Sequence, residues 1–125
     1  SNLQARRLCP IRMLLGASPA YLEAHGCPQH PGELAEHRLL RYAAAGRGAI
    51  RLPDGRGGET LVQAEAPVVA NNGDFLTEMA VAGHGIVVIP SFIAWRALAA
   101  GDLVEILPAH APAWVVAVVL AVGAG

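Results

Sequence analysis

Short apolar runs alternate with helix starts along this chain, and this alternation constrains the fold more than any other feature. The clearest run is Ile86-Val87-Val88-Ile89, bounded by Gly85 and Pro90. A short, continuous apolar run between turn residues is typical of a strand buried on both faces of a sheet. We predict two further strands of this kind, at 11–16 and 66–70, each leading into a helix start. Strands that alternate with helices indicate an α/β fold with a mostly parallel sheet flanked by helices.

Capping residues predict three helices. Serine and asparagine side chains accept hydrogen bonds from the free N–H groups at a helix start, and glycine favours the left-handed turn at a helix end. The predicted helices are Pro19 to about His25 capped by Ser18, a helix from Asn71-Asn72-Gly73-Asp74 to Gly83 with Asn71 as the cap, and 92–100 capped by Ser91. One face of the second helix should carry Phe75, Leu76, Met79 and Ala80.

The remaining segments complete the expected element order. A hairpin should bring Ile50–Leu52 opposite Thr60–Val62 across the turn Pro53-Asp54-Gly55, although a long mobile loop is the alternative. The other predicted elements are a short helix from Pro31 to Glu36 and strands at Arg38–Tyr42, Leu103–Leu107 and Ala113–Leu120. Trp95 and Trp114 are predicted to be buried anchors of the core.

Composition excludes several classes of protein. Hydrophobic residues make up 54% of the 125 residues and charged residues 15%, which excludes intrinsic disorder. The formal net charge is −1, so the chain alone is a poor nucleic-acid binder. Cys9 and Cys27 cannot form a disulfide framework. The apolar stretch 111–125 is shorter than the ~20 residues of a membrane span, and Ser1–Arg7 shows no signal-peptide pattern. We therefore expect a cytoplasmic protein that does not enter a membrane.

Three helix starts are candidate binding sites. In open α/β sheets, ligands bind beyond the carboxyl ends of the strands, where free N–H groups at helix starts attract anions. The chain has such starts at Ala17-Ser18, Asn71-Asn72-Gly73 and Pro90-Ser91. We expect them to cluster at one edge of the sheet. The alternative is that Ser18, Asn71 and Ser91 only cap their helices.

Catalytic, metal and cofactor chemistry lack a recognisable pattern. Gly83-His84-Gly85 lies between a helix and a strand, whereas a dinucleotide fingerprint lies between a strand and a helix. The residues His25, Cys27, His30 and His37 do not follow the spacing of a structural zinc site. No nucleophile–base pair or carboxylate pair stands out. We therefore predict no enzyme activity, no metal and no cofactor.

Several motifs, taken together and in order, resemble those of one protein family. The motifs are Arg7-Leu8, Leu15-Gly16-Ala17-Ser18-Pro19-Ala20-Tyr21-Leu22, His25-Gly26 with Pro28, His30-Pro31-Gly32-Glu33-Leu34-Ala35-Glu36-His37, Asn71-Asn72-Gly73-Asp74, Ala82-Gly83-His84-Gly85-Ile86, Ile89-Pro90, Gly101-Asp102-Leu103-Val104 and Leu107-Pro108. This series resembles the second effector subdomain of LysR-type transcriptional regulators over roughly residues 5–120. His84 departs from the pattern, because an apolar residue usually stands between the two glycines.

The resemblance implies a fold like that of type II periplasmic binding proteins. In such a fold, two α/β subdomains are joined by crossing strands, and a small effector, here a carboxylate or another small anionic or aromatic molecule, binds between them. Residues 13–111 would form the second subdomain, with linking segments at 1–12 and 112–125. DNA would be bound only by an N-terminal helix-turn-helix outside this chain. By analogy, Asn71, Asn72 and Gly73 would contact the effector, with Phe75 and Ser18 behind them.

The resemblance leaves two other functional classes open and makes one structural prediction. A solute-binding protein of a transport system shares the fold, and an enzyme on the same scaffold is the third alternative. These regulators usually form homo-oligomers. Without the first subdomain, the linking strands would expose unpaired edges. We therefore expect a strand-paired or swapped dimer of this chain.

Overall fold

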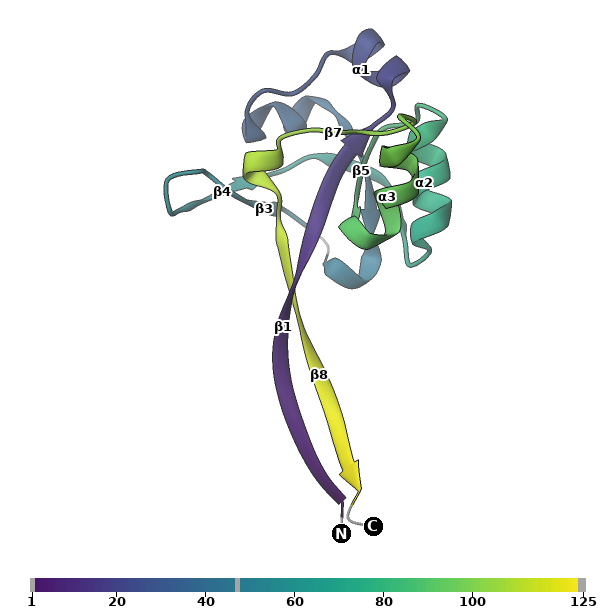
Figure 1. The fold of residues 1–125 in the computed structure, drawn as a ribbon. Helices are drawn as coiled ribbons and strands as arrows, with labels where there is room; N and C mark the ends of the chain where they lie inside the picture. The colour runs from purple at the N-terminus through teal and green to yellow at the C-terminus, as the bar shows by residue number, and fades with distance from the viewer. Residues whose placement is uncertain (1, 47, 124–125) are drawn as a thin grey trace.

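The computed structural model describes residues 2–46 and 48–123, and its longest strand has two parts with different neighbours. Strand β1 (Asn2–Ala17) pairs along residues 2–12 with the antiparallel strand β8 (Ala113–Gly123). These two segments form a ribbon that extends away from the body of the protein (Figure 1). Residues 13–17 of β1 instead pair with β6 (Ile86–Pro90) and β7 (Val104–Glu105) inside the body. One strand therefore belongs to both the body and the ribbon.

The sheet of the body is mixed. Its strand order is β5 (Glu65–Ala70), β2 (Arg38–Tyr42), β6, β1 and β7. Strand β2 is parallel to β5 and β6, but β1 is antiparallel to β6 and β7. The prediction of an α/β fold is confirmed, whereas the prediction of a mostly parallel sheet is wrong. Strands β1 and β2 therefore run in opposite directions, and the connection between them, which contains helix α1 (Pro19–His25) and the 3-10 helix η1 (Pro31–Glu36), begins and ends at the same edge of the sheet.

Both faces of the central strands are buried, as their continuous apolar runs predict. Neighbouring strand residues point to opposite faces, so Met13 and Leu15 of β1 enter one apolar cluster and Leu14 enters the other. The second cluster lies under the helices α2 (Gly73–Val81) and α3 (Ser91–Ala99) (Figure 1). The first cluster also contains the buried residues Tyr21, Leu34, Ile50, Leu52, Val62, Ile106 and Leu107.

The predicted hairpin is present, and its apolar side contributes to the core. Strands β3 (Ile50–Pro53) and β4 (Glu59–Val62) pair antiparallel. Asp54 closes the turn, because its Oδ1 accepts hydrogen bonds from the N–H groups of Arg56 and Gly58 at 2.7 and 3.0 Å. Two short 3-10 helices, η2 (Ala43–Ala45) and η3 (Pro108–His110), complete the described elements. Among the described residues, no helix has the length and apolar character needed to cross a bilayer.

The helix starts differ in one detail from the prediction. Ser18 caps α1 as expected, accepting a hydrogen bond from the N–H of Tyr21. The cap of α2 is Asn72, not Asn71: Asn72 Oδ1 accepts from the N–H of Phe75 at 3.0 Å. Ser91 is already the first residue of α3, and the preceding Pro90 has no side chain that could cap it. Both starts therefore lie one residue away from the predicted position.

Two strands and one tryptophan also depart from the sequence prediction. The ribbon continues β1 back to Asn2 and β8 forward to Gly123, because each segment supplies the other's hydrogen-bond partners. The strand expected at 103–107 shortens to β7, since it pairs only with the end of β1. Trp95 is 58% exposed on α3 rather than buried, whereas Trp114 packs partly buried against the first cluster.

A buried tyrosine–histidine pair joins α1 to the start of β2. The hydroxyl of Tyr21 lies 2.6 Å from Nδ1 of His37, and both side chains are buried. Burial lowers the pKa of His37, and the positive charge of nearby His25 lowers it further, while Glu36 and Glu33 act in the opposite direction. Burial also raises the pKa of Tyr21. The folded protein therefore favours the neutral form of both residues.

This pair predicts a loss of stability in mild acid. Below the ordinary histidine pKa of 6.5 the unfolded chain binds the proton more readily than the folded chain. The stabilisation is complete above that pH and disappears as the pH falls through the lower folded pKa. We expect His37→Gln to flatten the dependence of unfolding free energy on pH between about 7 and 5, measured by urea denaturation. The exposed His30→Gln control should leave the dependence unchanged, and equal slopes in wild type and His37→Gln would contradict the prediction.

The corrected cap of α2 predicts different effects for two neighbouring asparagines. Asn72→Ala removes the acceptor for the N–H of Phe75 and should lower the unfolding free energy by about 1 kcal/mol. Asn72→Asp retains an acceptor and should restore most of that loss. Asn71→Ala should have little effect, because Asn71 is exposed and precedes the cap. Urea denaturation of the three variants tests this order, and a larger loss in Asn71→Ala would contradict the cap assignment.

Candidate ligand-binding site

The three predicted helix starts do not gather at one edge of the sheet. The starts after β5 and β6 share an edge, since both strands are parallel to β2. Strand β1 runs in the opposite direction, with Gly16 opposite Val87 and Met13 opposite Pro90. Ser18 therefore lies about five strand residues, or about 16 Å, from the level of Asn71 along the strand direction. The expectation that Ser18 joins the other two starts is wrong, and its observed role is to cap α1.

The segment Asn71-Asn72-Gly73 lies where β5 leads into α2. Asn71 and Asn72 are exposed, and the side chain of Asn72 is occupied by the helix cap. Gly73 is buried because α3 packs closely: a Cβ at this position would lie 2.6 Å from Cδ1 of Ile93. Phe75 is 46% exposed. These residues form a surface beside the strand ends, and Asn71 has the side chain most available to a ligand.

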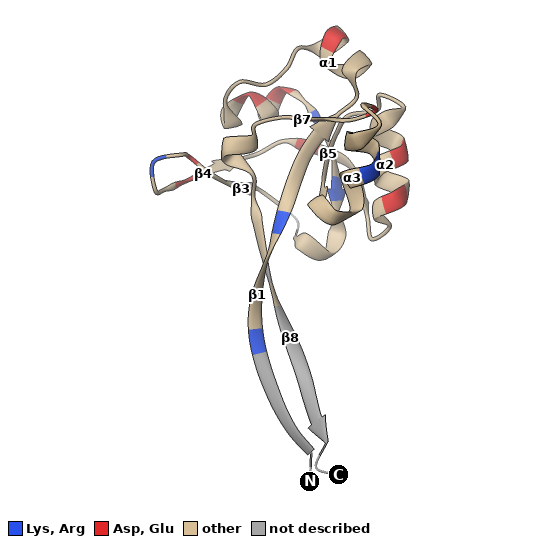
Figure 2. Ribbon diagram, viewed as in Figure 1, with Lys and Arg blue, Asp and Glu red and all other residues tan. Residues whose placement is uncertain are grey.

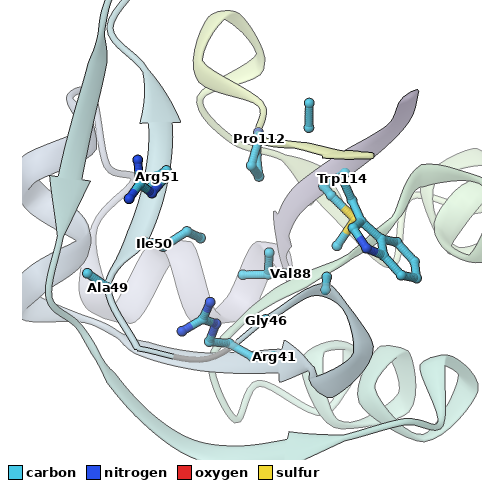
Figure 3. Close-up of a pocket in the computed structure, with 11 residues that line it drawn as sticks. Arg41, Gly46, Ala49, Ile50, Arg51, Val88, Pro112 and Trp114 are labelled. Atoms are coloured by element: carbon cyan, nitrogen blue, oxygen red, sulfur yellow. The ribbon is translucent and has the colours of Figure 1, made fainter. Parts of the chain in front are cut away.

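A pocket of about 250 Å³ opens at the same edge, where the ribbon meets the body. Figure 3 shows it between the hairpin, the end of β2 and the base of the ribbon. The lining residues are Met13, Arg41, Ala45, Gly46, Ala49, Ile50, Arg51, Val88, Pro112, Ala113 and Trp114. Both the body and the base of the ribbon therefore contribute to its wall. None of the five predicted site residues lines it.

The charged residues of this pocket are two arginines. Burial lowers the pKa of Arg41, whose Nη1 donates a hydrogen bond to the carbonyl of Gly48. Arg51 is largely exposed and lies 3.8 Å from the carboxylate of Glu59. Acidic residues are carried by α2 and the 3-10 helix η1 (Figure 2), and none of the residues that line the pocket is acidic. The pocket combines apolar walls with positive charge, a composition suited to a small organic anion.

Sequence reasoning missed this pocket because its walls come from four distant segments. One local signal was available: Arg41 interrupts a strand whose preceding residues, Leu39 and Leu40, are buried on opposite faces. An arginine within a buried strand needs either a partner or an opening to solvent. The residues of the hairpin and ribbon base gave no comparable local signal, because their proximity depends on the tertiary fold.

The histidine-rich segment and His84 lie elsewhere. Among residues 2–46 and 48–123, no three His, Cys, Asp or Glu side chains are close enough to hold a metal ion. The side chain of His37 is hydrogen-bonded to the hydroxyl of Tyr21. His84 is exposed and precedes β6, at the edge opposite the pocket. The next residue must be a glycine, because the backbone of Arg38 packs closely against it. A Cβ at Gly85 would lie 2.6 Å from the carbonyl oxygen of Arg38.

Several curated transcriptional regulators are similar in sequence to this chain. It is 38% identical over 111 residues to an uncharacterised HTH-type transcriptional regulator of Haemophilus influenzae, an alignment covering 88% of this chain and 38% of that protein. It is 32% identical over 108 residues to the HTH-type transcriptional regulator CrgA of Neisseria meningitidis, covering 86% of this chain and 36% of CrgA. The chain therefore spans less than two fifths of the length of these curated relatives.

Solved structures share its fold. The regulatory domain of CrgA, a LysR-type transcriptional regulator from Neisseria meningitidis, matches with a TM-score of 0.71 and 26% identity, covering 93% of this chain and 58% of that domain. Full-length AphB, a virulence activator of Vibrio cholerae, matches with a TM-score of 0.74 and 23% identity, over 93% of this chain and 43% of AphB. The family model of the LysR substrate binding domain matches residues 1–124. This chain belongs to the LysR substrate-binding domain family, whose regulatory domains have the type II periplasmic-binding-protein fold.

Proposed function

We propose that this chain is the second subdomain of the effector-binding domain of a LysR-type transcriptional regulator. In this proposal residues 13–111 form the subdomain, and residues 1–12 and 112–125 link it to the first subdomain. A small-molecule effector binds at the edge that carries the pocket and Asn71. The residues there contact the effector without transforming it. DNA is bound by a helix-turn-helix outside this chain, and the regulator acts as a homo-oligomer.

One observation carries this proposal: the pocket is lined by the body and by the base of the ribbon. Ala113 and Trp114 belong to the base of the ribbon, whereas Met13, Arg41 and Val88 belong to the sheet of the body. A ligand held between them would bind with a different affinity if the ribbon changed its orientation relative to the body. Differential affinity is what allows a ligand to shift a conformational equilibrium. Effector binding can thereby change the position of the first subdomain, to which the ribbon leads in this proposal.

The relatives favour a regulator over the solute-binding alternative. Both sequence relatives described above are named as transcriptional regulators. The solute-binding alternative rests only on a shared fold, and one fold hosts many unrelated functions. We therefore retain the regulator as the proposed function.

A substitution of Asn71 in the full-length regulator tests this function. Asn71→Ala should reduce the effector response by roughly tenfold, the effect of losing about one hydrogen bond. DNA affinity in the absence of effector should remain nearly unchanged. Reporter transcription across an effector series and DNA binding by fluorescence anisotropy measure the two quantities. His84→Ala, exposed at the opposite edge, is the matched control. Equal loss of effector response and DNA affinity would indicate a structural role and contradict the proposal.

The ribbon predicts association of this chain by itself. Within the described residues, the 2–12 segment of β1 pairs with β8 along one side only, leaving an edge that can accept another strand. We expect light scattering after size exclusion to give about twice the chain mass of 13.0 kDa. Leu8→Lys places a charge at a 69% exposed ribbon position and should favour the monomer, unlike Leu61→Lys on the hairpin, where the leucine is 61% exposed. A monomer at every concentration would contradict this prediction.

A further inference from the structure

Arg41 is an unusual residue for the middle of a sheet. It belongs to β2, which pairs on both sides, and it lies one residue beyond the buried pair Leu39 and Leu40. In β2, the residue two positions earlier on the same face is Leu39, a member of the first apolar cluster. Arg41 is half-buried, and this burial lowers the pKa of its guanidinium. A partly desolvated cation is costly unless hydrogen-bond acceptors or an opposite charge compensate it.

The compensation that Arg41 receives from the protein is incomplete. Nη1 donates to the carbonyl of Gly48, but a guanidinium has five N–H donors. Two other arginines have carboxylate partners: Arg12 lies 2.5 Å from Glu105, and Arg51 lies 3.8 Å from Glu59. Among residues 2–46 and 48–123, no acidic side chain pairs with Arg41. Its remaining donors are thus available to an anion entering the pocket.

The rest of the pocket suits an apolar group. Figure 3 shows the guanidinium of Arg41 among Ala49, Ile50 and Val88, while the indole of Trp114 lies on the other side of Val88. The indole is held by Tyr42, with ring centroids 5.8 Å apart in an edge-on arrangement. A ring or short alkyl chain packed against these side chains would exclude water from the charged group. Excluding water strengthens the attraction between a guanidinium and an anion.

We propose that Arg41 is the specificity residue of this pocket: its guanidinium selects an effector that carries a carboxylate, while the apolar part of that effector packs against Trp114. This inference rests on the proposed function and names the ligand class and specificity residue of that site. A planar guanidinium binds a carboxylate through two parallel hydrogen bonds. The volume of about 250 Å³ accommodates one ring or a short chain. The apolar side chains of Ile50, Val88 and Trp114 in the wall favour an anion with an apolar body over inorganic phosphate, which needs polar partners on all sides.

The two tryptophans of the chain permit a direct binding measurement. Trp95→Phe removes the exposed tryptophan of α3 and leaves Trp114 as the sole tryptophan reporter. Benzoate and cyclohexanecarboxylate are the probes, and benzamide and inorganic phosphate are the comparison ligands. From typical affinities per atom, we expect benzoate to change the Trp114 fluorescence with a Kd of about 10 mM or lower. Benzamide and phosphate should bind at least about tenfold more weakly, since they lack either the charge or the apolar body.

Variants of the two pocket arginines test the assignment to Arg41. Arg41→Gln should weaken benzoate binding at least about tenfold, and Arg41→Lys should restore only part of it, because an ammonium lacks the paired donors. Arg51→Gln, the matched control, should change the Kd by less than about threefold, since Arg51 is exposed and near Glu59. If Arg41→Gln fails to fold, judged by circular dichroism, the benzoate-to-benzamide ratio in the Trp95→Phe chain still decides the ligand class.

The outcomes separate this inference from the proposed function. Equal binding of benzoate and benzamide, or a larger loss in Arg51→Gln than in Arg41→Gln, would overturn the role of Arg41 as the carboxylate anchor. The absence of any fluorescence change up to about 10 mM benzoate, at which a ligand of this size is expected to bind, would also overturn it. None of these results affects the effector response of the full-length regulator and its dependence on Asn71, which tests the proposed function separately.

Discussion

The structure depends on β1, because this one strand is hydrogen-bonded both in the ribbon and in the sheet of the body. Its first part pairs with β8 in the ribbon, and residues 13–17 pair with β6 and β7 in the body. All three of these pairings of β1 are antiparallel, so the direction of β1 decides which strand ends meet at each edge of the sheet. The ion pair of Arg12 with Glu105 adds a side-chain link between the two parts, at the point where β1 leaves the ribbon. The pocket forms at that same junction.

The junction explains why a site at this place suits a sensor. A ligand buried wholly within the body would contact residues whose positions are set by the two apolar clusters. At the junction, Ala113 and Trp114 belong to the ribbon base, whereas Met13 and Arg41 lie in the body. A ligand that contacts both can favour one arrangement over another, and only such differential contacts transmit binding to a distant part of a protein.

The sequence predicted the local elements closely, with errors at their ends. The apolar run at 86–89 and the hairpin around Asp54 were predicted correctly, because each depends on local periodicity or turn chemistry. The cap of α2 was placed one residue early, since two adjacent asparagines carry the same capping group and only backbone geometry distinguishes them. Trp95 was predicted to be buried, but its position on α3 faces away from the cluster under that helix. Helical spacing alone left that orientation open.

The sequence by itself determined the order of strands and helices, the identity of the family and the helix starts where polar groups accumulate. These features depend on interactions between residues a few positions apart, or on motifs that keep their order along the chain. Only the tertiary structure decided which of these residues meet. Ser18 and Asn71 lie at opposite edges because β1 pairs antiparallel with a strand some 70 residues later. Arg41 and Trp114 line one pocket because β8 pairs with β1, a strand about 100 residues earlier in the chain. No local pattern of side chains specifies the direction of such a pairing.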